Sequence, residues 1–255
     1  MVKVNIFIPC HNEQVLLPLT INHYRKMFSD CNITIYDNYS TDKSVEIAKS
    51  MGCNVIDWDT NNEINDFILS DMRSNCWKNI KEGWVLTPDM DEWLCINEEE
   101  LIEEEQKGTT IISTKGYNMF GNSKTETLED INLNSVEIGY YWDLYDKNIC
   151  FKVPDVIEMN YKLGSHGIKP IGNIVFSKKY YILKHFELVG LPFYKKKKID
   201  RYNRSETMRK MGHCQHYTND KKLIEDTYNE AVKRCNNIYF LHESYFATKI
   251  IIYNI

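Results

Sequence analysis

Two patterns of apolar and polar residues, one strand-like and one helix-like, follow each other in turn over the first 60 positions of the chain. Short apolar runs have the length and alternation of strands, and helix-like stretches lie between them. The expected strands are 2–9, 32–36 and 54–58, and the expected helices are 15–28 and 44–49. This alternation of strand and helix predicts crossover units and a largely parallel sheet.

The pattern is less regular in the remainder of the chain. The expected elements there are a helix at 63–81, strands ending at 86 and spanning 109–114, a loop at 122–134, and helices at 195–210 and 220–234. The predicted fold class is therefore α/β, a mixed, mostly parallel central sheet flanked by helices, with an elaborated helical C-terminal part. We expect one domain over residues 1–255.

The composition is that of an ordinary folded chain. Of 255 residues, 43% are hydrophobic and 26% are charged, which argues against a disordered or collagenous protein. The net charge of -5 gives no overall attraction to nucleic acid, so no nucleic-acid partner is expected and an anionic ligand needs local cations or a metal. No apolar segment reaches the roughly 18 to 20 residues of a transmembrane helix.

The eight cysteines are scattered without a Cys-x-x-Cys pair, which argues against a knuckle-type zinc site. With no signal peptide before the first strand, they favour a reducing cytosol, so the expected location is cytoplasmic. The lysine run 195–198 is interpreted as the solvated start of a helix. The apolar tail at 250–253 predicts a packed terminal helix or the interface of a homo-oligomer.

Two aspartates one residue apart give the strongest chemical signal. Asp89 and Asp91 follow an apolar run, and side chains two apart on an extended segment share a face. Mg²⁺ and Mn²⁺ prefer carboxylate oxygens supplemented by substrate phosphates. A solvated turn is the alternative, but apolar runs on both sides indicate a strand-to-loop junction, where ligands of α/β sheets gather. The pair therefore predicts a cation site beside a nucleotide diphosphate.

Two further polar segments, Pro9–Glu13 and Asp37–Asp42, also follow presumed strands. Parallel strands bring such ends to one edge of a sheet, where an acidic residue can accept hydrogen bonds from a base or ribose. The alternative is that Asp37 and Asp42 only shape a turn and cap the next helix. Three such segments in one chain favour a shared ligand site.

Three segments, taken in their order along the chain, resemble those of the family 2 glycosyltransferases of the GT-A fold. They are Pro9-Cys10-His11-Asn12-Glu13, Asp37-Asn38-Tyr39-Ser40-Thr41-Asp42 and Asp89-Met90-Asp91-Glu92. The resemblance is strong over residues 1–115 and looser beyond. It implies a Rossmann-like GT-A enzyme, hexosyltransferase-like, whose residues 1–115 bind a nucleotide-sugar donor and whose residues 116–255 bind the acceptor.

The resemblance also implies roles for single residues. The nucleotide pocket would be lined by Pro9, Cys10 and Glu13, and the base would be met by Asp37 with Asn38. Asp89 would touch the ribose or the metal, and Asp91 would ligate Mn²⁺ or Mg²⁺ on the diphosphate. Arg73 is expected near the diphosphate or in a salt bridge with Asp66 or Asp71.

The resemblance also implies that a histidine from the C-terminal half completes the metal site. His166 is preferred because glycines at 164 and 167 allow close backbone approach, and Lys169 could offset phosphate charge. His185 is the alternative, and a structural role is open for both. An inverting enzyme also needs a carboxylate base, for which Asp155 and Glu158 are candidates without a matching motif, so the base and the stereochemistry stay open.

Three functions remain. The first is a metal-dependent glycosyltransferase that moves a sugar from a nucleotide-diphosphate donor, a UDP-sugar by preference, to a carbohydrate, glycoprotein or glycolipid acceptor. The second is a sugar-nucleotide nucleotidyltransferase, suggested by Leu17–Thr20, although Cys10–Glu13 lacks the glycine-rich basic loop of those enzymes. The third is a catalytically silent nucleotide- or carbohydrate-binding module, against which the intact acidic pair counts.

Overall fold

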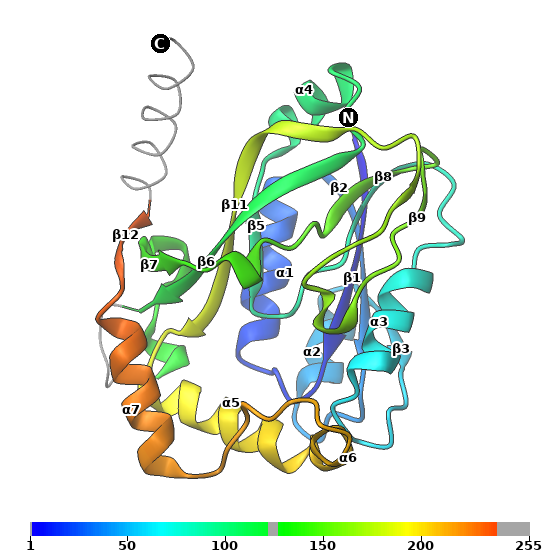
Figure 1. Cartoon of the computed structure of the whole chain (residues 1–255). Coiled ribbons are helices and arrows are strands. Elements are labelled where there is room, and N and C mark those ends of the chain that lie inside the picture. Colours follow the sequence, from blue (N-terminus) through cyan, green and yellow to red (C-terminus); the bar gives the residue numbers. More distant parts are fainter. Residues whose placement is uncertain (1, 122–126, 239–255) are drawn as a thin grey trace.

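The computed structural model describes residues 2–121 and 127–238 and contains one large sheet with helices packed around it (Figure 1). Its strands are β1 (Lys3–Cys10), β2 (Asp30–Asp37), β3 (Asn54–Asp57), β4 (Gly83–Leu86), β5 (Glu92–Cys95), β6 (Ile111–Phe120), β7 (Ile138–Tyr141), β8 (Cys150–Val153), β9 (Val156–Glu158), β10 (Ile171–Gly172), β11 (Phe176–Leu188) and β12 (Asn236–Asn237). Its α-helices are α1 (Leu16–Met27), α2 (Ser44–Ser50), α3 (Asp66–Asn75), α4 (Glu98–Gln106), α5 (Leu191–Asn203), α6 (Glu206–Lys210) and α7 (Lys221–Val232).

The strand order along the large sheet is β12-β7-β6-β8-β4-β1-β2-β3, and β11 pairs with both β5 and β6. Strands β1 to β4, β6 and β11 run in one direction, whereas β5, β7 and β8 run in the other. Strands β9 and β10 form a separate antiparallel pair. The predicted class, a mixed, mostly parallel α/β sheet flanked by helices with a helical C-terminal part, is confirmed.

The sheet is buried on both faces, as parallel strands between helices require. Strand β1 shows this, because Val4, Ile6 and Ile8 pack in one core cluster with Tyr24 of α1, whereas Phe7 packs in a second cluster. Successive side chains of a strand point to opposite faces, so this alternation fixes the register of β1 between the two layers.

The structure changes the bounds of three predicted elements. The helix expected at 63–81 spans only Asp66–Asn75, because the Asn65 side chain caps its first turn and accepts from the backbone N–H groups of Phe67 and Ile68. The strand expected at 109–114 continues to Phe120, because β11 pairs along it. The helix expected at 195–210 starts at Leu191 and divides at Arg204–Ser205 into α5 and α6.

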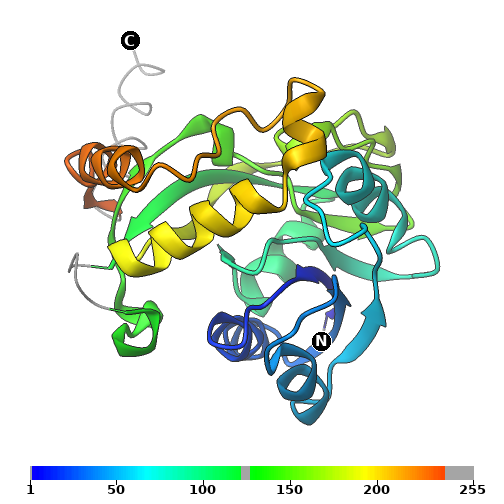
Figure 2. The same ribbon diagram turned by 90° about the horizontal axis from the view of Figure 1, so that it is seen from below.

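Helix α5 runs across the edge at which β1, β2 and β4 end (Figures 1 and 2). Among the described residues, no helix has the length and apolarity needed to span a membrane. The apolar tail at 250–253 and part of the predicted loop, 122–126, lie outside the residues described.

Candidate functional site

A cavity of about 1170 Å³ opens between the carboxyl ends of the strands and α5. Residues of all three polar segments line it, namely Pro9, Cys10 and Glu13 after β1, Asn38 after β2, and Asp89 after β4. Helix α5 lines the opposite wall with Lys197, Lys198 and Arg201, and Arg204 follows directly after its last residue. The strand order thus brings together segments that are up to 80 positions apart in the chain.

Hydrogen bonds hold the first two polar segments against each other. Asn12, whose φ of 54° lies in the left-handed region, donates its backbone N–H to Ser40 Oγ at 2.9 Å and accepts from the Thr41 N–H at 2.7 Å. The Glu13 N–H donates to Ser44 Oγ at 2.8 Å. These bonds fix the turn after β1 where its backbone forms part of the cavity wall.

One end of the cavity is built around Asn38. Its amide nitrogen donates to the Trp58 carbonyl at 2.7 Å, and its amide oxygen accepts from Thr60 at 2.9 Å and from Arg204 after α5. Arg204 also lines the cavity, as does Trp58, which the sequence did not single out.

Asp37 is buried behind this wall rather than lining the cavity. Its Oδ2 accepts from the Ser40 N–H at 3.1 Å, but its buried Oδ1 has no hydrogen-bond partner among the described residues. A buried acceptor without a donor is costly, so this oxygen is suited to an N–H group from a ligand.

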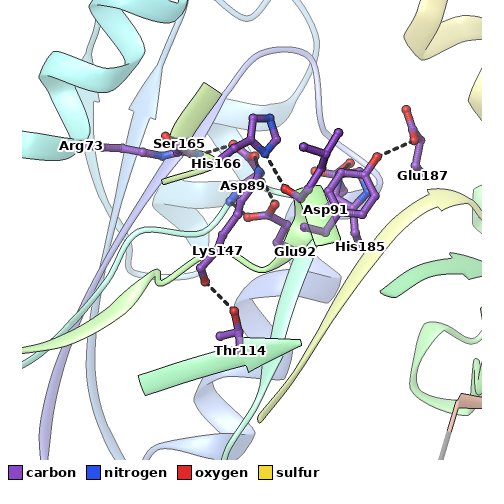
Figure 3. A network of polar contacts seen from close by, with 12 residues as sticks. Arg73, Asp89, Asp91, Glu92, Thr114, Lys147, Ser165, His166, His185 and Glu187 are labelled. Atoms are coloured by element: carbon purple, nitrogen blue, oxygen red, sulfur yellow. Dashed lines mark hydrogen bonds and ion pairs between the residues drawn. The ribbon is translucent and has the colours of Figure 1, made fainter. Parts of the chain in front are cut away.

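Both carboxylate oxygens of Asp89 are held by cations (Figure 3). Arg73, buried on α3, binds Oδ1 and also donates to Ser165 Oγ at 2.6 Å, while Lys147 donates to Oδ2 at 2.9 Å. Lys147 also contacts Glu92 at 2.5 Å. Burial opposes ionisation of Asp89, but Arg73 and Lys147 hold its pKa well below the usual value. Arg73 therefore pairs with Asp89 and not with Asp66 or Asp71, the partners considered from the sequence.

Asp91 is only 1% exposed and faces a different set of groups. Its Oδ2 lies 3.3 Å from Nε2 of His185 and forms an ion pair with Lys197 of α5. His185 reaches Asp91 because β11 pairs antiparallel with β5, with His185 opposite Glu92. Burial lowers the pKa of His185, which favours the neutral imidazole, and its Nδ1 has no hydrogen-bond partner among the described residues.

Asp91 and His185 suit a divalent cation better than Asp89 does. Two neighbouring ligands on an octahedral ion with bonds of about 2.1 Å lie about 3 Å apart, close to the observed 3.3 Å. Asp89 already accepts from a cation on each oxygen. Among the described residues no three His, Cys, Asp or Glu side chains gather around one point, so substrate phosphates would have to supply the remaining ligands.

The structure places the other two predicted ligand-binding residues differently. His166 lines the cavity, but its Nδ1 donates to the Leu144 carbonyl at 2.5 Å (Figure 3). Lys169 is exposed and does not line the cavity. The segment from Gly164 to Lys169 thus contributes one histidine at the cavity and no lysine.

The lysine run on α5 is not a solvated surface. The Lys197 and Lys198 side chains are only 11% and 15% exposed, and they pair with the buried carboxylates of Asp91 and Glu187. The prediction of a solvated helix start is therefore wrong for these two lysines. Arg201, one turn further on, lines the cavity and has a ring contact with Tyr217, but it forms no hydrogen bond or ion pair with other residues in the described part of the chain.

Glu187 is a buried carboxylate of the cavity wall that the sequence interpretation missed. Its Oε1 lies 2.6 Å from Lys198 Nζ, and its Oε2 accepts from the Tyr145 hydroxyl at 3.0 Å and the Asn118 amide at 3.2 Å. Burial opposes its ionisation, but Lys198 and then His185 lower its pKa far below the usual range. The available signal was the spacing of His185 and Glu187, two polar residues that share one face of an apolar strand.

The base candidates from the sequence lie away from this cavity. Asp155, in the turn between β8 and β9, is 3.6 Å from Lys152, and Glu158 is 2.5 Å from Lys78. Neither lines the cavity. Aromatic side chains line the wall near Glu187 instead, among them Tyr140, Trp142, Tyr145 and Tyr194.

Comparisons with known proteins identify the family of the chain. A family model described as Glycosyl transferase family 2 matches residues 5–155, more than half of the chain. Protein RfbJ of Shigella flexneri is 33% identical over 53 residues, which cover 21% of this chain and 41% of RfbJ. The chain therefore spans less than half of that relative.

Two solved structures show weaker likeness. The S. aureus TarS fragment 1–349 is 15% identical, with 77% of this chain and 63% of the fragment covered and a TM-score of 0.44. Glucosyl-3-phosphoglycerate synthase from Mycobacterium tuberculosis, solved with Mn²⁺, UDP and glucosyl-3-phosphoglycerate, is 16% identical, with 46% and 44% covered and a TM-score of 0.30. Since the family model spans more than half of the sequence, the chain belongs to glycosyl transferase family 2.

Proposed function

We propose that this glycosyltransferase moves a sugar from a nucleotide-diphosphate donor, a UDP-sugar by preference, to a carbohydrate, glycoprotein or glycolipid acceptor. The observation that carries the proposal is one cavity whose wall joins Pro9–Glu13, Asn38 and Asp89 to the cations of α5. Residues 1–115 would form the donor half of this site and residues 116–255 the acceptor half.

The order of groups along α5 supports this assignment. Arg204, at the C-terminal end of α5, binds Asn38, whereas Lys197 binds Asp91 two turns earlier. A nucleotide would bind with its base at Asn38 and its diphosphate near Asp91. The unpartnered Oδ1 of Asp37, behind the wall at Asn38, would suit an N–H donor of the base, and both uracil (N3–H) and cytosine (N4–H) carry one.

The diphosphate would meet two kinds of positive charge. Arg201 can bind phosphate oxygens, because it is a cation without a hydrogen-bonding partner among the residues described. Asp91 and His185 would hold Mn²⁺ or Mg²⁺ once Lys197 moves from Asp91 to a phosphate oxygen. When bound, the ion stabilises negative charge on the departing nucleoside diphosphate. Arg73 and Lys147 would keep Asp89 oriented toward the ribose, since each carboxylate oxygen can accept a second hydrogen bond.

The alternatives have less support. Nucleotidyl transfer needs a basic, glycine-rich loop for a triphosphate, and Cys10–Glu13 has neither glycine nor arginine. A silent binding module would not need a buried carboxylate, Glu187, and a histidine, His185, paired with the buried Asp91, on the wall of its cavity.

UDP release from UDP-glucose, UDP-galactose and UDP-N-acetylglucosamine tests the proposal, with water or added sugars as acceptors. We expect release with Mn²⁺ that falls at least tenfold with a chelator or in Asp91→Asn. Glu104→Gln is the matched control, because Glu104 is equally buried, bonded to Thr109 and Tyr181, and absent from the cavity wall. Release that is indifferent to both the chelator and Asp91→Asn would contradict the metal role, and no release from any donor would contradict the function.

A further inference from the structure

We propose that the acceptor is a carbohydrate with an anionic group, a carboxylate or a phosphate, and that Arg234 binds this group at the end of the cavity between β7 and α7. This inference rests on the proposed function. It narrows the acceptor, which the proposed function leaves among carbohydrates, glycoproteins and glycolipids. Strands β7 and β12 and helix α7 lie side by side at this end of the molecule (Figure 1).

One row of side chains leads from the expected place of the diphosphate to this end of the cavity. Asn118 of β6 is the register partner of His185 on β11 and of Tyr140 on β7, and all three line the cavity. Register partners share a face of the sheet, and neighbouring strands lie about 4.8 Å apart, so Tyr140 is about 10 Å from His185. An acceptor beyond the donor sugar would therefore reach Tyr140.

Asn118 has an unused hydrogen-bond acceptor in this row. It is only 1% exposed, and its amide nitrogen donates to Glu187 Oε2 at 3.2 Å. Glu187 pairs with Lys198 as a carboxylate, which only accepts, so the amide oxygen of Asn118 must face elsewhere. This Oδ1 has no hydrogen-bond partner among the described residues. Because a buried acceptor without a donor is costly, Oδ1 suits a hydroxyl group of a sugar.

Aromatic rings form the wall beyond Asn118. Tyr140 and Trp142 are stacked with an angle of 28° between their planes, and the ring centres of Trp142 and Tyr145 are 5.2 Å apart. All three rings line the cavity. The face of an aromatic ring is electron-rich and attracts the C–H groups of a sugar ring. This wall therefore suits a carbohydrate acceptor.

Arg234 supplies positive charge at the end of the aromatic wall. Strand β12 pairs antiparallel with β7, with Asn236 opposite Gly139. This pairing brings Arg234 to Tyr140, and its guanidinium carbon lies 4.3 Å from the centre of the Tyr140 ring. Arg234 also lines the cavity. Its guanidinium forms no hydrogen bond or ion pair within the part of the chain that the structure describes.

Two neighbouring cations of the cavity wall already have partners. Lys198 pairs with Glu187 at 2.6 Å, and Lys233 pairs with Glu230 at 2.5 Å. Arg234 therefore keeps its N–H donors for a ligand. A guanidinium presents parallel N–H groups that match two oxygens of a carboxylate or a phosphate, and such charge-assisted bonds are stronger than neutral ones.

A purely structural role for Arg234 gives different expectations. If the guanidinium only covered the Tyr140 ring, its replacement would affect neutral and anionic acceptors alike. Under our inference the loss is confined to anionic acceptors, because only these use the charge. Arg234 is exposed, so its replacement is not expected to unfold the protein.

The test measures UDP release from the three UDP-sugars named above, with Mn²⁺ and a panel of acceptors. The panel is glucose and galactose, their uronates and their 6-phosphates, with water alone as the background. We expect at least one uronate or 6-phosphate to raise the rate about tenfold more than its neutral parent sugar. A preference for uronates over 6-phosphates, or the reverse, identifies the anionic group.

Arg234→Met should raise the KM for the preferred anionic sugar about 10- to 150-fold, the usual value of hydrogen bonds to a charged group. Release of UDP to water and the Kd for UDP should stay within twofold of wild type. Lys222→Met is the matched control, because Lys222 is an exposed cation of α7 that pairs with Asp226 and does not line the cavity. This control should leave all three quantities unchanged.

Three results would overturn the inference while leaving the proposed function intact. They are an equal response to neutral and anionic sugars, including no response to either, a KM in Arg234→Met within threefold of wild type, and an equal rise in KM for neutral and anionic sugars. Wild-type protein that releases no UDP from any of the three donors, with water or with any sugar, would overturn the proposed function, and this inference with it.

Discussion

Replacing Lys147 by methionine tests the charge network around Asp89. Lys147 and Arg73 together neutralise Asp89 and Glu92, and the four side chains make a group of zero net charge in which only Asp89 is partly exposed. The exposed fraction is 5% for the Lys147 side chain and 0% for that of Glu92. Lys147→Met leaves one negative charge uncompensated beside the buried carboxylate of Glu92.

Removal of one partner from a buried ion pair costs about 3 to 5 kcal/mol in the free energy of unfolding. For a chain of this length, each kcal/mol lowers Tm by about 2 to 4 °C, so we expect a decrease of roughly 6 to 20 °C. Lys152→Met is the matched control, because Lys152 also contacts two carboxylates, Glu105 at 3.0 Å and Asp155 at 3.6 Å, but is 25% exposed. Exposed pairs contribute about 0 to 1 kcal/mol, so this variant should stay within a few degrees of wild type.

The assay is urea denaturation followed by circular dichroism, with thermal melting beside it. Adding Glu92→Gln to Lys147→Met removes the uncompensated charge and keeps an oxygen for the Asp89 N–H. The double variant should therefore be about 1 to 3 kcal/mol more stable than the sum of the single losses predicts. A loss below 1 kcal/mol in Lys147→Met, or strict additivity with Glu92→Gln, would refute the view of Asp89 as a charge held between two cations.

Two further predictions concern the donor end. Burial raises the pKa of Glu13 to about 7, above the value of about 4.3 that a glutamate has in the unfolded chain. The contribution of the Glu13 side chain to the free energy of unfolding is therefore fully present below about pH 4.3 and is lost as pH rises through 7. Glu13→Gln should therefore melt higher than wild type at pH 8 and equally at pH 4, and a lower Tm at pH 8 would contradict this. Trp58→Ala should weaken UDP binding by about 1 to 3 kcal/mol in calorimetry, the usual value of base–aromatic stacking, and leave inorganic pyrophosphate binding unchanged. Equal losses for both ligands would argue against a base at Trp58.

The first half of the fold could be predicted because its information is local. Strands such as Lys3–Cys10 are short apolar runs ended by polar turns, and parallel strands place those turns at one edge. The same rule explains why Pro9, Asn38 and Asp89 lie on one cavity. None of these steps requires knowledge of which residues touch across the chain.

The second half could not be predicted in the same way, because its contacts depend on pairing across long sequence separations. Lys197 and Asp91 are 106 positions apart, and His185 meets Asp91 only through the register of β11 with β5. A lysine run has the composition of a surface, and only the position of α5 over the cavity shows that Lys197 and Lys198 are enclosed.

A crystal structure with UDP and Mn²⁺ tests the central claim most directly. The account predicts an anomalous manganese peak bonded to Asp91 Oδ2 and His185 Nε2, diphosphate oxygens on the same ion, Arg201 on the phosphates, and Lys197 moved away from Asp91. Manganese bound by Asp89 or His166, or UDP bound outside the cavity beneath α5, would contradict it.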